Sequence, residues 1–437
     1  MLPDLKLTGG LRWTDDQKHF VDIPSELLVA GYGYADSGIV DQNWQKITGR
    51  FSANWSPKLD FTDQTLLYGS YSRGYKAGGA NPPGAILGLY NGAAGVNGIP
   101  THPLTFDPEY IHAFEVGTKN TLLDGAITFN ASAFYYDYKG YQISEIVDRT
   151  SINLNFDAHV KGAEVEATYE PLPGLRFRFA GGYEHTRIND GQSAIDLMDR
   201  TAGHAGWIVM RPWVQQSSNC IMPVYVAAAL AQVYAGSGEG DDEATSACGY
   251  AYSSHLDPVP SLPYDYSGHP TNSGRALAPI PADYPGFDPL SVDPNAPANV
   301  NEGLGLAPNN GAGFSKDLGG NELPNAPPFT VSFSADYTIP VTSDWAATFH
   351  TDYYWQDYSW ARVFNDNPYD RLRGYTNINL ALILTSQNGW QVMGYVKNIF
   401  DVTDITGTFL NSDDSGLTTN IFLTDPRLFG VRVTKSW

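Results

Sequence analysis

Charged residues are scarce in this chain and unevenly divided between the two signs. Only 17% of the 437 residues are charged, and 26 Lys and Arg stand against 47 Asp and Glu, which gives a net charge of −21. Proteins that bind nucleic acid present a basic surface that neutralises phosphates. The deficit of basic residues therefore excludes a general affinity for nucleic acid.

Long hydrophobic runs are also missing. No run reaches the roughly 18 apolar residues that a transmembrane helix needs, although 42% of the residues are hydrophobic. The first residues show no charged leader followed by an apolar stretch, so we expect either a cytoplasmic protein or one whose front is missing. A membrane β-barrel remains compatible with these absences, because its alternating strands average to a polar composition.

Sequence signatures of catalysis and metal binding are absent too. The chain has no His-Glu-x-x-His, no Cys-x-x-Cys and no Gly-x-Ser-x-Gly, so zinc and serine-hydrolase chemistry lack their residues. Segment 411–416 imitates the start of a calcium loop, but Phe422 stands where the bidentate Glu belongs. We expect no enzyme, no cofactor and no metal site.

The chain has only two cysteines, Cys220 and Cys248. Both lie in a Pro-, Gly- and Ser-rich insert at 188–323, and one disulfide formed in an oxidising compartment is favoured over two unrelated thiols. An apolar stretch at 221–234 suggests one short helix in the insert. The insert is either a loop without a specific role or a lid over a substrate entrance.

The chain does contain a clear two-residue alternation. Odd positions of segment 47–55 are apolar or small and even ones are polar, and segments 127–135, 329–339, 390–397 and 429–437 repeat the pattern. Such a period gives strands with one apolar and one polar face. The pattern predicts twelve strands, at 3–15, 44–56, 64–74, 108–121, 125–148, 151–170, 174–187, 324–340, 344–364, 370–386, 389–402 and 418–437.

Short and long connections alternate between these strands, as in outer-membrane barrels with short periplasmic turns and long outer loops. A secreted β-sandwich is the alternative. Trp and Tyr near strand ends, among them Trp44, Trp55, Trp345 and Trp390, favour the barrel. The sequence predicts an all-β, antiparallel transmembrane β-barrel over 1–437, with about 12 strands and an extracellular insert at 188–323.

Several segments resemble the carboxy-terminal barrel of TonB-dependent outer-membrane transporters. The resembling stretches, in order, are Leu5–Asp16 (LKLTGGLRWTDD), Leu67–Asn81 (LYGSYSRGYKAGGAN), Phe106–Asn120 (FDPEYIHAFEVGTKN), Leu123–Tyr138 (LDGAITFNASAFYYDY), Val160–Glu166 (VKGAEVE), Leu323–Pro327 (LPNAP), Val396–Asp401 (VKNIFD) and Pro426–Trp437 (PRLFGVRVTKSW). The resemblance implies a last aromatic residue that the barrel-assembly machinery reads. Trp437 stands in that place, where Phe is usual, and Lys435 stands where an apolar residue is common.

The family barrel has 22 strands behind an amino-terminal plug, so the resemblance implies that this chain holds the second half and lacks the plug. We expect a truncated product or fragment; a closed twelve-stranded barrel that pairs 3–15 with 418–437 is the alternative, since open edges cannot face lipid. The implied function is active uptake across the bacterial outer membrane, among lipopolysaccharide and outer-membrane lipid, energised by TonB and its inner-membrane complex through the plug.

The implied substrate is a scarce nutrient such as a ferric siderophore; cobalamin, nickel complexes and oligosaccharides use the same architecture. A passive twelve-stranded porin and a secreted soluble binding module are the alternative functions. Candidate ligand contacts are side chains expected to face the lumen near the outer ends of strands, where aromatic rings lie beside amide and guanidinium donors. They are Arg73, Tyr75, Lys76, Tyr354, Gln356, Tyr358, Trp360 and Arg362.

Overall fold

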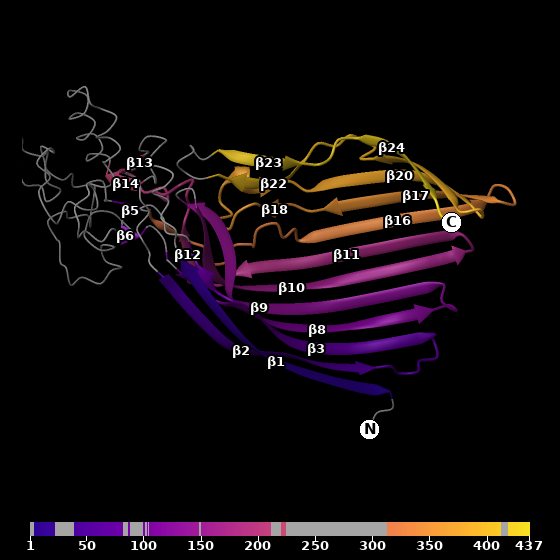
Figure 1. Ribbon diagram of the computed structural model, residues 1–437, viewed down its shortest axis with the longest axis horizontal. Helices are drawn as coiled ribbons and strands as arrows, with labels where there is room; N and C mark the ends of the chain where they lie inside the picture. Colours follow the sequence, from indigo (N-terminus) through magenta and orange to yellow (C-terminus); the bar gives the residue numbers. More distant parts are fainter. Residues whose placement is uncertain are drawn as a thin grey trace, which may run out of the picture.

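The computed structural model describes residues 4–21, 39–81, 86–87, 99–100, 103, 105–147, 150–210, 220–223, 313–411 and 418–437. Twelve long strands form one antiparallel sheet in which each strand pairs with the next long strand along the chain (Figure 1). They are β1 (Leu5–Val21), β2 (Ile39–Trp55), β3 (Gln64–Lys76), β8 (Glu109–Leu122), β9 (Ile127–Val147), β10 (Thr150–Leu172), β11 (Leu175–Ile188), β16 (Phe329–Pro340), β17 (Trp345–Gln356), β20 (Tyr375–Ser386), β21 (Trp390–Lys397) and β24 (Leu428–Lys435).

Short elements occupy the longer connections. The described ones are β4 (Gly79–Ala80), β5 (Ile86–Leu87), β6 (Ile99–Pro100), β7 (Thr105–Phe106), β12 (Ser193–Ile195), β13 (Trp207–Met210), β14 (Cys220–Pro223), β15 (Ser315–Asp317), β18 (Ser359–Trp360), β19 (Arg371–Leu372), β22 (Ile405–Leu410) and β23 (Thr419–Leu423), with one 3-10 helix at Pro368–Asp370. They pair two by two beside the main sheet. No helix within the described residues has the length and hydropathy to cross a membrane.

The predicted all-β antiparallel fold and the order of its twelve strands are confirmed, but several boundaries were wrong; the first strand, for example, ends at Val21 and not at residue 15. The predicted strand 324–340 begins only at Phe329, because Pro324, Pro327 and Pro328 lack the N–H that a ladder needs. Strand β17 then ends at Gln356, eight residues before predicted, since its partner β16 extends no further. The predicted strand 418–437 is divided into β23 and β24 around Pro426.

The two faces of the sheet differ in polarity as the alternation predicts. Along one row Tyr337 pairs with Phe349 and Phe349 with Leu382, and all three side chains are exposed. Leu11 and Val116, on other strands, are 88% and 61% exposed. No second sheet covers this apolar face among the described residues, which is not the arrangement of the β-sandwich alternative.

Apart from the two-residue connection between β9 and β10, short and long connections lie at opposite ends of the sheet. The turns at 56–63, 123–126, 173–174, 341–344 and 387–389 are at the end where both chain termini lie, and the long connections are at the other (Figure 1). Strands β1 and β24 form the two edges and pair with β2 and β21 respectively; the described residues contain no pairing between β1 and β24.

Candidate functional site

Three loop segments come together at the long-loop end, and we call 189–200, 313–328 and 357–374 the cap. Its first two segments are the roots of the insert, and they join through the pairing of β12 with β15. Backbone bonds extend this pairing: the Ile188 N–H donates to the Asn321 carbonyl at 2.8 Å, and the Leu318 N–H to the Gln192 carbonyl at 2.8 Å. The insert therefore leaves the sheet through a closed neck.

A small hydrophobic core holds the cap against the sheet. Ile188 and Leu318 are completely buried, and Val363 and Phe364 from the third segment pack with them. The wall below is made by β9 and β10, including Phe134 and Val160. These side chains lie on the face opposite the exposed apolar residues. Phe134 pairs with Gly162, and the pair two residues along is Ser132 with Glu164, so Phe134 shares a face with these polar residues. The cap thus covers part of the polar face.

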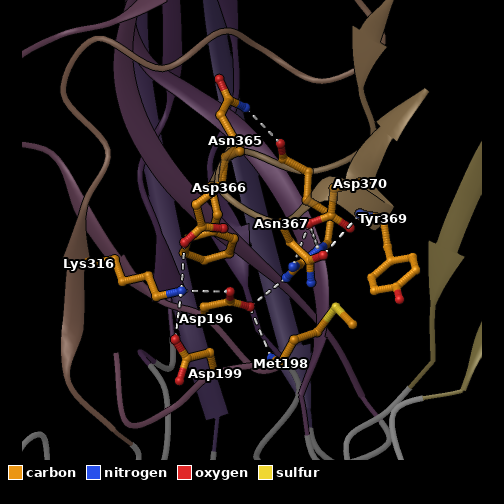
Figure 2. A network of polar contacts seen from close by, with 12 residues as sticks. Asp196, Met198, Asp199, Lys316, Asn365, Asp366, Asn367, Tyr369 and Asp370 are labelled. Atoms are coloured by element: carbon orange, nitrogen blue, oxygen red, sulfur yellow. Dashed lines mark hydrogen bonds and ion pairs between the residues drawn. The ribbon is translucent and has the colours of Figure 1, made fainter. Parts of the chain in front are cut away.

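A network of ion pairs lies within the cap (Figure 2). Asp196, whose residue is 1% exposed, accepts a hydrogen bond from Arg362 Nη1 at 2.6 Å and another from Lys316 Nζ at 3.1 Å. Arg362 also bonds the Asp370 carboxylate at 2.6 Å, and Lys316 bonds Asp366 at 2.8 Å and Asp199 at 3.1 Å. Asp196 thus joins the other two cap segments, because one of its cations comes from each.

The charges of this network stabilise one another. Burial alone would lower the pKa of Lys316, but hydrogen bonds and charges of Asp366, Asp196 and Asp199 raise it above the ordinary lysine value. Burial would likewise lower the pKa of Arg362, which Asp370 and Asp196 raise. The pKa of Asp199 is lowered, since hydrogen bonds from Lys316 and Thr201 outweigh the effect of burial. The ionised form of each group is therefore the one that the cap favours.

Neutral hydrogen bonds connect the second and third cap segments. The Asn321 side chain donates to the carbonyls of Val363 and Phe364 at 2.9 Å each. The Asn325 N–H donates to the Trp360 carbonyl at 2.7 Å. Asn325 has a φ of 55°, a left-handed conformation that Asn adopts more readily than most residues. The Leu323–Pro327 stretch, quoted above for its resemblance, is part of this junction.

Five of the predicted ligand residues lie close along the chain at this end of the sheet. Tyr354 and Gln356 are on the polar face of β17, and the Tyr354 hydroxyl donates to Gln356 Oε1 at 3.0 Å. Tyr358, Trp360 and Arg362 follow inside the cap. The Tyr358 hydroxyl donates to Glu322 Oε1 at 3.0 Å, which together with burial raises its pKa, with burial the larger cause. Their role in binding stays a prediction.

The other three predicted residues lie six strands away on β3 and do not share one orientation. Arg73 pairs with Gly49 on β2 and with His112 on β8. Tyr71, Arg73 and Tyr75 follow one another at steps of two residues, so a regular strand turns all three to one face. Lys76 is three residues after Arg73 and therefore faces the other side of a regular strand. The prediction that all three residues face the lumen is wrong for such a strand. Arg73 lies 5.4 Å from the ring centroid of Tyr110.

Other predictions fall elsewhere. The expected helix at 221–234 is wrong at its start, because residues 221–223 belong to strand β14; the rest of that stretch, Cys248 with its disulfide, and the loop 412–416 lie outside the described residues. Trp437 is fully exposed at the last position. Sequence reasoning missed the five other charged residues of the network around Arg362 as site residues, and only their closeness to the Leu323–Pro327 stretch and to the insert's roots could have signalled them. They are Asp196, Asp199, Lys316, Asp366 and Asp370.

Within the described residues, no group of three or more His, Cys, Asp or Glu side chains is arranged to hold a metal ion. Residues 2–212 match the family model described as TonB dependent receptor-like, β-barrel. Comparison with the curated proteins gives no match. The family match thus covers the strands from β1 to β11 and part of the insert.

Three solved structures share the fold at low sequence identity. The ferric yersiniabactin uptake receptor FyuA from Yersinia pestis is 14% identical, with a TM-score of 0.53 over 98% of this chain and 43% of its own. The siderophore receptor PiuA from Acinetobacter baumannii is 13% identical, with a TM-score of 0.51 over 99% and 40%. The copper transporter OprC is 12% identical, with a TM-score of 0.52 over 99% and 45%. The chain spans less than half the length of each.

Proposed function

We propose that this chain carries the β-barrel of a TonB-dependent receptor and is the barrel portion of an outer-membrane transporter for a scarce, large solute. It acts as a transporter and not as an enzyme. TonB and the inner-membrane complex energise uptake through a plug, and the barrel-assembly machinery inserts the chain. The observation that carries the proposal is the twelve-stranded sheet with an exposed apolar face and long connections at one end only.

The exposed face supports a membrane location. Contiguous apolar patches on soluble monomers seldom exceed several hundred Å², whereas here apolar side chains are exposed on strands from β1 to β24. Hydrocarbon accepts such side chains, and the strand ladder supplies partners for the backbone. The polar face then lines the lumen.

The position of the cap supports a route for a solute at the long-loop end. Tyr354 and Gln356 lie on the lumen side just below the cap, and Tyr358 lies within it. Two of the structures of similar fold are named as a ferric yersiniabactin receptor and a siderophore receptor, and a third as a copper transporter. We therefore propose a metal-bearing solute, with a ferric siderophore as the leading class.

Cell fractionation tests the location. We expect the chain in the outer-membrane fraction with gel mobility that changes on heating; a chain that stays in solution without detergent would overturn the proposal. Uptake of a radiolabelled ferric chelate by iron-starved cells tests the transport, and we expect a proton-gradient uncoupler to abolish it. Steady ion conductance of the chain in planar bilayers without an energy source would favour the passive porin instead.

A further inference from the structure

An apolar groove crosses the outward face of β16, β17, β20 and β21. It encloses about 470 Å³ and is lined chiefly by Tyr337, Phe349, Leu380, Leu382, Gly394 and Val396. Because these residues belong to the exposed apolar face, the groove opens toward the side where the proposed function places the membrane.

The groove exists because small residues interrupt two rows of large ones. In one row Leu382 pairs with Gly394 and Gly394 with Val431. A Cβ atom placed on Gly394 would meet nothing within 4 Å, so the space above it is open. In the next row Ala335 pairs with Thr351. Gly394 and Ala335 therefore form the bottom of the groove, and the rings of Tyr337 and Phe349 form its side.

A cation lies below the groove on the same face. Lys435 pairs with Trp390 in the register, and its ammonium lies 5.4 Å from the ring centroids of both Trp390 and Trp437. It donates to the Asn388 carbonyl, and no carboxylate of the described part forms an ion pair with it. Trp beside Lys at the end of an apolar face is typical of the level where hydrocarbon meets water.

The spacing between the cation and the groove suits one lipid molecule. Trp390 and Gly394 point to the same side of β21, four residues apart, which is about 14 Å at ~3.4 Å per residue. One leaflet contributes about 15 Å, half of a hydrocarbon core of about 30 Å. A headgroup beside Lys435 therefore places its acyl chain over Gly394.

We propose that this surface binds one phospholipid, with the headgroup phosphate against Lys435 and an acyl chain in the groove beside Gly394. The phosphate supplies the negative partner that the ammonium lacks within the described residues, and the groove supplies apolar contact to the chain. The inference rests on the proposed function in one respect, namely that the apolar face meets the membrane.

Native mass spectrometry of the full chain in detergent micelles, titrated with dioleoylphosphatidylglycerol, tests the site. We expect one lipid to be retained by the unmodified chain. Gly394→Leu fills the groove and Lys435→Gln removes the charge, and each is expected to weaken retention at least tenfold, with Gly394→Ala intermediate. Heat-modifiable gel mobility shows that each variant is folded.

Gly9→Leu is the matched control. Gly9, on β1, pairs with Phe51 on β2 and lies on the same face as the groove. A Cβ atom on Gly9 would also meet nothing within 4 Å, so we expect unchanged lipid retention. Equal retention by all variants would mean a non-specific lipid shell and would overturn the site. Loss in Gly394→Leu but not in Lys435→Gln would overturn the headgroup contact. Either result leaves the location of the chain in the outer membrane, measured separately, unaffected.

Discussion

The apolar face of the sheet and the cap are built on opposite principles. On the apolar face large side chains are exposed, and each depends on neighbours two residues away or on the adjacent strand. In the cap, charges are buried and paired over long separations: Arg362 and Asp196 are 166 residues apart, and Lys316 and Asp196 are 120 apart. The sheet therefore follows from local pattern, whereas the cap needs specific partners.

The largest expected effect is at Asp196, where a single substitution tests the cap. Asp196→Asn keeps the shape but removes the charge between Arg362 and Lys316, and breaking a buried ion pair typically costs about 3–5 kcal/mol. We expect faster amide hydrogen exchange at 313–326, with β8 and β9 unchanged. Asp190→Asn is the control, since the Asp190 side chain is 84% exposed and pairs with the nearby Arg187; equal effects of the two changes would show that the cap does not depend on its buried charges.

A charge on the apolar face is expected to have the next largest effect. Val116→Arg places a guanidinium on the lipid side of β8, which costs about 2–4 kcal/mol near the bilayer midplane. Ser132→Arg puts the same group on the polar face of β9, close to Glu164 in the register, and should be tolerated. Urea unfolding in lipid vesicles measures both, and a smaller loss for Val116→Arg than for Ser132→Arg would contradict the assignment of the faces.

A buried amide outside both regions is expected to have a smaller effect. Asn398 donates to the carbonyls of Val402 and Asp425 at 2.8 and 2.9 Å and accepts from the Val402 N–H at 2.9 Å, which closes the base of the β22–β23 hairpin. Asn398→Ala leaves these groups unpaired, at a cost of about 1–3 kcal/mol. Proteolysis within 398–427 should increase, whereas Asn411→Ala, which removes one exposed bond to Thr418, should change little.

The smallest effect is expected from pH within the physiological range. The lowered pKa of Asp199 contributes stability above about pH 3.9 that is lost as the pH falls through its folded value. The raised pKa of Lys316 contributes stability below about pH 10.4 that is lost as the pH rises further. Hydrogen exchange of the cap should therefore be flat between about pH 5 and 10 after correction for intrinsic rates. A step near pH 6.5 would point to a histidine instead.

The alternation revealed the sheet because strand faces are set by a period of two that any stretch of ten residues displays. It placed Tyr354 and Gln356 on the polar face for the same reason. It did not reveal the cap, because Asp196, which Arg362 shares with Lys316, comes from the far side of a long insert, and only folding of β11 against β16 brings these residues together. The prediction for Arg73 and Lys76 did not follow this rule, since two residues three apart on β3 cannot both face the same side of a regular strand.

The neck formed by β12 and β15 separates the closure entropy of the insert from the folding of the sheet. Residues 189–328 intervene between β11 and β16, and each doubling of a flexible loop adds only about 0.6 kcal/mol of closure entropy. With the neck closed at Ile195 and Ser315, the stretch from 211 to 312 adds little to that cost whatever its length. On this ground we expect a shortened or replaced stretch to leave the pairing of β11 with β16 intact.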